Sequence, residues 1–180
     1  MVSIRDVLAP EVENSTLYQS PTATINSDGR YYSPLEIKIE TGRYTATGII
    51  EAKVYLDGED FPQKDDGLWI NINEERVFTG TIEKASNNGD GTWSLKAYDA
   101  IKEMKRDTTS RTFEDAKISE VVRIIAGFAG LTPIVDIPED LAVSPDFDNT
   151  PILRAVDQLS KWGNALWWID ENNTLHIEEV

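Results

Sequence analysis

The stretch from Asp57 to Gly67 is the densest group of side chains in this sequence that could do chemistry. Its carboxylates belong to Asp57, Glu59, Asp60, Asp65 and Asp66. Calcium takes roughly six to eight oxygen ligands, which such loops can supply. The spacing does not match an EF-hand loop, which needs a central glycine and a late glutamate. We therefore interpret the stretch as a solvated acidic loop, with a calcium site as the alternative.

A second oxygen-rich segment contains Asn87, Asn88 and Asp90 within the run SNNGDG. Asparagine, aspartate and glycine tolerate positive φ, which tight hairpin turns require. The run therefore predicts a hairpin turn, and a cation site is again the alternative.

Pairs of carboxylates could also serve as the acid and the nucleophile of a glycosidase. With 32 acidic residues, some pair will always look suggestive. No glutamate stands in an apolar helical setting between the polar loops that a sugar cleft needs. The sequence has no cysteine and one histidine, His176, which we expect to be a partly exposed strand residue. We expect no catalytic residue, no cofactor and no metal-binding residue.

Tryptophans gather near the C-terminus. They are Trp162, Trp167 and Trp168, with Trp69 and Trp93 earlier in the chain. Successive side chains of a strand point to opposite faces, so one ring of the Trp167-Trp168 pair should enter the core. The other should face a helix or a neighbouring subunit, and stacking on a sugar or base is the alternative.

The formal net charge is -15, and the acidic residues are spread along the whole chain. This opposes binding to a nucleic-acid backbone, which needs clustered lysine and arginine. A spread acidic surface is also typical of halophilic proteins. No apolar run approaches the roughly 20 residues that span a membrane.

The pattern predicts a small antiparallel β-barrel over residues 25–106, after an extended N-terminal arm over residues 1–24. Leu35, Ile37 and Ile39 alternate with charged residues, which predicts a strand with one buried face. Similar alternation marks the segments Tyr44–Leu56, Leu68–Ile72 and Val77–Asp99. Several short strands joined by turns favour a closed barrel or a sandwich.

Residues 107–180 predict a small α+β domain with two helices. The polar run 105–112 is the expected domain boundary. Helical spacing joins Ile118, Val121, Val122, Ile125 and Phe128. A strand over Thr132–Ile137 and a loop over residues 138–149 should follow. Thr150 should then cap a second helix that Gly163 ends, before a hairpin around residues 171–173.

The ordered motifs resemble the baseplate hubs, or late control proteins, of phage tails. The first is the block VFTGTIEKASNNGDGTWSLKAYD, with its F-x-G-x-I strand and terminal YD. It is followed by an extended TF step, the helix AKISEVVRIIA and the segment NTPILRAVDQLSKWGNALWWIDENNTLHI. The match covers roughly residues 35–180, and the sequence is also similar to hub modules of type VI secretion spikes.

The resemblance implies a structural virion protein whose tail-tube-like barrels form a ring, a trimer or a hexamer, between the tail tube and the distal tip or baseplate. Its implied partners are further copies of itself, the tube protein, the tape-measure protein and a tip or spike protein, without a membrane and with DNA only as passing cargo. It implies a location in the virion tail after assembly in the host cytoplasm, in a particle that could be archaeal and halophilic.

Hubs of this family continue into a second barrel, whereas this sequence stops at Val180. We therefore expect either a hexamer or a second polypeptide that supplies the other barrel. For packing between subunits we select the hairpin Val77–Asp99 and the exposed member of the Trp167/Trp168 pair. The alternatives are a tail-associated cell-wall hydrolase and a calcium-dependent adhesion module.

Overall fold

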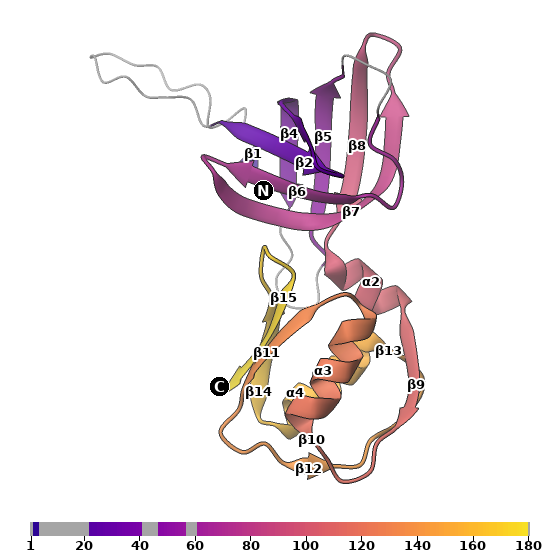
Figure 1. Cartoon of the computed structure of the whole chain (residues 1–180), viewed down its shortest axis with the longest axis vertical. Helices are drawn as coiled ribbons and strands as arrows, with labels where there is room; N and C mark the ends of the chain where they lie inside the picture. Colours follow the sequence, from indigo (N-terminus) through magenta and orange to yellow (C-terminus); the bar gives the residue numbers. More distant parts are fainter. Residues whose placement is uncertain (1, 4–21, 41–46, 57–60, 180) are drawn as a thin grey trace, which may run out of the picture. The chain divides into compact units, whose positions relative to one another are not determined.

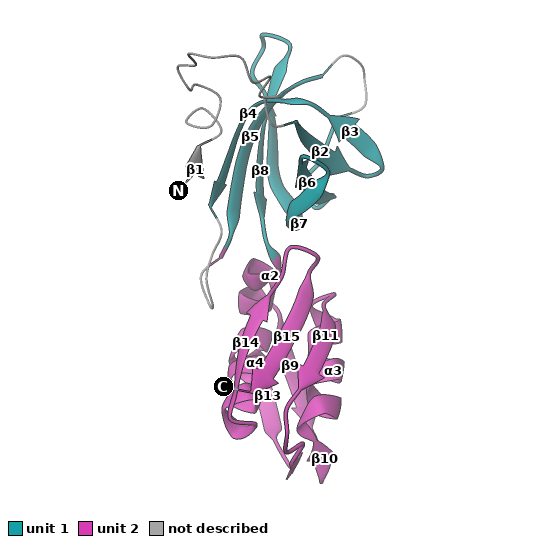
Figure 2. Ribbon diagram, turned by 90° about the vertical axis from the view of Figure 1, so that its left-hand side faces the viewer, with its two compact units in different colours: residues 1–42, 48–99 teal, residues 43–47, 100–180 magenta. Residues whose placement is uncertain are grey.

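A computed structural model describes residues 2–3, 22–40, 47–56 and 61–179 (Figure 1). The chain divides into two compact units, coloured separately in Figure 2. The first unit comprises residues 1–42 and 48–99, and the second comprises residues 43–47 and 100–180. The predicted arm (1–24) lies almost wholly outside the described residues, as do positions 41–46 and 57–60 of the predicted barrel.

The described part of the first unit is one antiparallel sheet of eight strands. They are β1 (Val2–Ser3), β2 (Ala23–Ser27), β3 (Arg30–Tyr32), β4 (Pro34–Glu40), β5 (Ile49–Tyr55), β6 (Gly67–Ile72), β7 (Glu75–Asn87) and β8 (Thr92–Tyr98). Their spatial order is β1-β4-β5-β8-β7-β6-β2-β3. The antiparallel fold class is as predicted, but this order is linear, and no hydrogen-bonded strand pair closes the described sheet into a barrel.

The long strand β7 is bent, and it brings the two halves of the sheet face to face. Its first half pairs with β6 up to Thr81, and its second half pairs with β8 from Thr81 onward. The register shifts between Ile82 and Lys84, and such a bulge bends a strand. Apolar side chains from both ends of the strand order therefore meet in one core, with Ile25 of β2 and Ile37 of β4 in the same cluster.

The predicted alternation holds along β5, where Ile50, Ala52 and Val54 are buried. It fails at Leu35, which is exposed although Ile37 is buried. The register of β4 against β5 shifts between Pro34 and Glu36. The extra residue at this bulge changes the phase of the alternation, so Leu35 does not share the buried face of Ile37.

The second unit contains three helices and seven strands among its described residues. The helices are α2 (Ala100–Arg106), α3 (Ile118–Phe128) and α4 (Ile152–Trp162). The strands are β9 (Thr108–Thr112), β10 (Ala116–Lys117), β11 (Thr132–Asp136), β12 (Ala142–Val143), β13 (Asp146–Pro151), β14 (Ala165–Ile169) and β15 (Thr174–Glu179). In the sheet β11-β15-β14, β11 runs parallel to β15 and β14 runs antiparallel to it.

Two polar segments that looked like a linker and a loop are strands. β9 lies in the predicted boundary 105–112, and it pairs with β13, which begins inside the predicted loop 138–149. Each contributes one side chain to the interior, Thr109 from β9 and Phe147 from β13. Each strand has only one buried position, so its sequence lacks the apolar alternation that would identify it as a strand. The helix α2 groups with the second unit and not with the first, because Ala100 and Met104 belong to the second core.

The helices begin and end differently from the prediction in two places. Thr150 does not cap α4, because it lies in β13 and its hydroxyl donates to the carbonyl of Asp148. The first N–H of α4, from Ile152, instead donates to the carbonyl of Asp107 at 2.9 Å. Phe128 was expected in the core, but it lies in the last turn of α3 with an exposed ring.

The helix α3 receives its N-terminal cap from a distant carboxylate. Asp140 accepts the backbone N–H of Ser119 at 2.9 Å and its hydroxyl at 2.6 Å. Burial raises the pKa of Asp140, but the two hydrogen bonds from Ser119 and the charges of Lys117 and Arg123 outweigh it, so the pKa lies below the ordinary value. The loop before β12 is thereby fixed to the start of the helix.

Candidate functional site

The glycine of the F-x-G-x-I motif marks the bend of the first sheet. A Cβ at Gly80 would collide with the carbonyl oxygen of Tyr98 and would lie 2.7 Å from Cε1 of Phe78. The end of β8 therefore passes directly over Gly80. The spacing of the glycine and the terminal tyrosine in this block is explained by a close approach of two strands, with no ligand needed.

The aspartate that follows Tyr98 has a similar structural role. Asp99 accepts the N–H of Gly48 at 2.6 Å, and its own N–H donates to the carbonyl of Gly48 at 3.2 Å. A Cβ at Gly48 would lie 2.6 Å from Asp99 Oδ2. The pair joins the end of β8 to the start of β5.

The paired tryptophans point to opposite faces of the three-stranded sheet, as predicted. Trp167 is buried in the core of the second unit, and Trp168 is 37% exposed. The sheet stands in front of α3 and α4 in Figure 2. Trp167 belongs to the same core cluster as residues of both helices, so these helices cover the face that carries Trp167. Trp168 is therefore on the opposite face, which the described residues of the second unit leave uncovered.

This uncovered face carries exposed apolar side chains on its two outer strands, β11 and β14, with a histidine on the middle strand between them. Ile134 of β11, His176 of β15 and Trp168 of β14 stand in one cross-strand row. Leu166 stands in the next row, opposite Glu178. Ile134 and Leu166 are 49% and 47% exposed. We call Ile134, Leu166, Trp168 and His176 the sheet patch.

The sequence reading missed Ile134 and Leu166. Leu166 could have been found, because it shares a strand face with Trp168 two residues later. Ile134 could not, because its place beside His176 depends on the parallel pairing of β11 with β15.

The ring of Trp168 is held by the histidine beside it. The two rings are stacked with centroids 5.0 Å apart and an interplanar angle of 2°. Nε2 of His176 lies 3.1 Å from Asp170 Oδ2, and Nδ1 lies 3.6 Å from Glu178 Oε1. His176 is thus a partly exposed strand residue, as predicted, and it orients Trp168.

Asp170 also closes the hairpin between β14 and β15. Its Oδ1 accepts the backbone N–H groups of Asn172 and Thr174, both at 2.9 Å. Burial raises the pKa of Asp170, but the hydrogen bonds from His176, Thr174 and Asn172 together outweigh it, so the pKa lies below the ordinary 3.8. The folded state therefore favours the charged carboxylate.

Replacing Asp170 by asparagine should cost stability at neutral pH and cost progressively less in acid. Because the folded pKa is depressed, the contribution of the carboxylate is fully present above pH 3.8 and is lost as the pH falls through the lower folded value. We expect a loss of about 1.5 kcal/mol at pH 7, the low end for hydrogen bonds to charged groups. Urea unfolding of both proteins between pH 7 and pH 2 measures the difference.

A suitable control is Asp148→Asn, which changes an exposed carboxylate of β13 in the same unit. Its difference from the wild type should stay small at every pH. A D170N difference that remained constant down to pH 2 would contradict the role given to the charge.

The oxygen-rich segments that were candidates for binding a cation form turns, in the part of the chain that the structure describes. Asp66 accepts the N–H of Gln63 at 2.8 Å within its own turn, whereas Asp57, Glu59 and Asp60 lie outside the described residues. Asn87 and Asp90 accept the N–H groups of Gly89 and Thr92, so the predicted hairpin turn is confirmed. No cluster of three or more His, Cys, Asp or Glu side chains that could hold a metal occurs within the described ranges.

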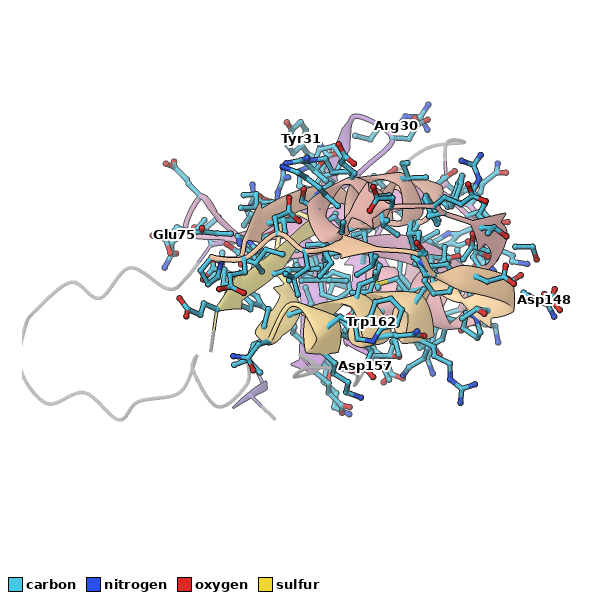
Figure 3. The ribbon with its side chains drawn as sticks, turned by 90° about the horizontal axis from the view of Figure 1, so that it is seen from below. Arg30, Tyr31, Glu75, Asp148, Asp157 and Trp162 are labelled. Atoms are coloured by element: carbon cyan, nitrogen blue, oxygen red, sulfur yellow. The ribbon has the colours of Figure 1, made fainter. Side chains whose placement is uncertain are left out.

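The other tryptophans do not gather into one site. Trp93 stacks on Phe61 with centroids 4.3 Å apart, and Arg76 lies over Trp69. Trp162, labelled in Figure 3, is exposed at the end of α4.

The helices of the described structure include none that is both long and apolar enough to cross a membrane.

The predicted hairpin Val77–Asp99 lies inside the strand order of the first sheet. The outermost described strands are β1 and β3. Among the described strands, the edges of this sheet are therefore β1 and β3, and not β7 and β8. Packing of the hairpin against another subunit stays a prediction.

A family model described as YQBQ-like matches residues 37–138, which is more than half of the chain. This match begins within β4 and ends after β11. A search of curated proteins by sequence found no match.

The fold is shared with solved tail proteins. The 43 kDa tail protein of prophage MuSo2 from Shewanella oneidensis superposes with a TM-score of 0.72 at 15% identity, over 90% of this chain and 56% of that one. The tail protein from Neisseria meningitidis MC58 gives 0.70 at 11% identity, over 87% and 51%. Prophage tail protein gp18 from Listeria monocytogenes EGD-e gives 0.59 at 14% identity, over 88% and 50%. The chain thus spans about half the length of these proteins.

Proposed function

This chain belongs to the YQBQ-like family, and we propose that it is a structural protein of a phage-like tail. In this proposal it is a hub or tail-tip subunit. Copies of the chain form a ring of three or six that joins the tail tube to the distal tip or baseplate. Its role is mechanical and not catalytic.

The observation that carries the proposal is the fold. The chain is similar in fold, over 87–90% of its length, to tail proteins of three bacteria at identities of 11–15%. A fold alone does not determine a function, so the proposal also draws on the sheet patch. Contiguous exposed apolar side chains on a soluble protein mark a surface for another molecule.

The partners follow from this position in the particle. The ring would contact the tail tube protein, the tape-measure protein and a distal tip or spike protein, and DNA would pass through it only as cargo. The net charge of -15 opposes lasting adhesion of the chain to that DNA. The mature location would be the virion tail, after assembly in the host cytoplasm.

Immunogold electron microscopy of purified particles tests the proposal. Antibodies raised against the purified chain should label the distal end of the tail only. Antibodies against the tube protein serve as the control and should label its whole length. Absence of the chain from purified particles, or labelling along the whole tail, would rule out a hub or tip role.

A further inference from the structure

The second unit exposes another apolar surface, on α3. Ile124 and Phe128 are 40% and 46% exposed, and they stand one helical turn apart on the same face. The guanidinium of Arg111 lies 5.0 Å from the centre of the Phe128 ring. We call Ile124, Phe128, Arg111 and the exposed Arg123 the helix patch.

The sheet patch and the helix patch have opposite charges around their apolar centres. The strands β11, β14 and β15 contain no lysine or arginine, and their acids include Asp136 and Glu178. The carboxylate of Asp170 stands at the hairpin end of the sheet patch. The helix patch has its two arginines. Of the acids near it, Glu120 accepts the N–H of Lys117, and Asp140 is held by the two hydrogen bonds from Ser119.

We propose that the helix patch of one copy of this chain docks on the sheet patch of the next copy. A three-stranded sheet that is covered by helices on one face would then be covered on the other face by the α3 of a neighbour. This is a layer arrangement that α/β structures commonly adopt. The apolar side chains would meet at the centre, and arginines would face carboxylates around the rim.

The charges argue against the other way of burying the sheet patch. Two sheet patches placed face to face would bring together two surfaces whose charged groups, such as Asp136 and Glu178, are acidic. Like charges in opposition disfavour such a contact. The two arginines of the helix patch complement the carboxylates of the sheet patch better than a second sheet patch would, in a chain whose net charge is -15.

The two patches are different surfaces of one unit, so the contact is heterologous. Such contacts generate a ring when the rotation between copies closes, and a filament when it does not. The inference rests on the proposed ring-forming function and names the contact within that ring. It gives Trp168 its role, which is to present an aromatic anchor at the centre of the docking surface.

Two single variants test the contact in the full-length chain. Leu166→Lys places a positive charge in the sheet patch, and Ile124→Glu places a negative charge in the helix patch. Both positions are exposed in one copy, so folding should be preserved, which circular dichroism checks. Sedimentation velocity should find concentration-dependent association of the wild type. Each variant should associate at least about tenfold more weakly, as for a residue at the centre of an interface.

Mixing the two variants gives the decisive result. L166K keeps an intact helix patch, and I124E keeps an intact sheet patch, so one contact can form between them. The equimolar mixture should therefore associate although each variant alone does so weakly. One contact between the two variants is intact, and in the other the added carboxylate of I124E faces the added amine of L166K. The matched control is Tyr55→Glu, which changes an exposed ring of β5, a strand with neighbours on both sides and outside both patches, and should associate like the wild type.

The outcomes separate this contact from the proposed function. If the wild type associates and both variants associate equally well, the contact is wrong while a ring-forming role survives. If I124E without its partner variant associates as strongly as the wild type, the helix patch is not part of the contact. If the mixture stays monomeric, a heterologous contact is excluded. A wild type that remains monomeric at every concentration overturns the contact, and the particle labelling then decides the proposed function by itself.

Discussion

Replacing Trp167 by alanine should lower the free energy of unfolding of the second unit by about 3–5 kcal/mol, the range for removing a buried aromatic side chain. Trp167 is buried in the core cluster that also contains Ile177, its cross-strand partner. Alanine would leave a cavity that the surrounding helices and strands cannot fill completely. A loss of this size is a large part of the roughly 5–15 kcal/mol that stabilises a typical domain.

The matched comparison is Trp168→Ala, one residue further along the same strand. That change removes the stack on His176 but no core contact, so it should cost about 1 kcal/mol. The free energy of unfolding of the second unit is measured for both variants in urea, with hydrogen exchange of the β14–β15 hairpin as the readout. Equal losses for the two tryptophans would contradict the assignment of opposite faces.

Those opposite faces were predictable because the period of a strand is fixed by its backbone. Two adjacent tryptophans in a strand must diverge, whatever the tertiary structure. The same rule gave the buried positions Ile50, Ala52 and Val54. Local turn chemistry was equally readable at Asn87 and Asp90, where the side chains close their own turn.

Interactions between segments distant in the chain could not be predicted from the sequence. Leu35 is exposed because its strand bulges against β5, and the sequence of β4 does not contain that register. The strands β9 and β13 exist through their pairing with each other, so each alone resembles a loop. Thr150 has the side chain of a helix cap, but the backbone of Asp107 supplies the first partner of α4 instead.

The candidate site was only half predictable for the same reason. Trp168 followed from the strand period, but Ile134 reaches the sheet patch through a parallel pairing across the unit. The helix patch was hidden further, because Phe128 fits the apolar spacing of α3 and looked like a core residue. Its exposure depends on what packs against the last turn of the helix, which is Arg111 from β9.

Gly80→Ala should destabilise the first unit by about 1–2 kcal/mol, because steric strain exceeds the gain from a less flexible unfolded chain. The new methyl group would meet backbone, the carbonyl of Tyr98, and the ring of Phe78 at 2.7 Å from Cε1. Neither can move without opening the β7–β8 pairing or displacing a core side chain. Alanine also restricts the unfolded chain, which favours folding by about 0.4–1 kcal/mol, so the strain of about 1–3 kcal/mol must exceed that gain.

Gly67→Ala tests whether the effect comes from the close approach and not from losing a glycine. Gly67 lies in β6, its register partner is Thr81, and a Cβ there would meet nothing within 4 Å. This variant should stay within about 0.5 kcal/mol of the wild type, as surface substitutions usually do. Urea unfolding with hydrogen exchange of β7 and β8 distinguishes the two. Comparable stability of both variants would mean that β8 can move away from Gly80, and that the glycine of the F-x-G-x-I motif is not required by the bend.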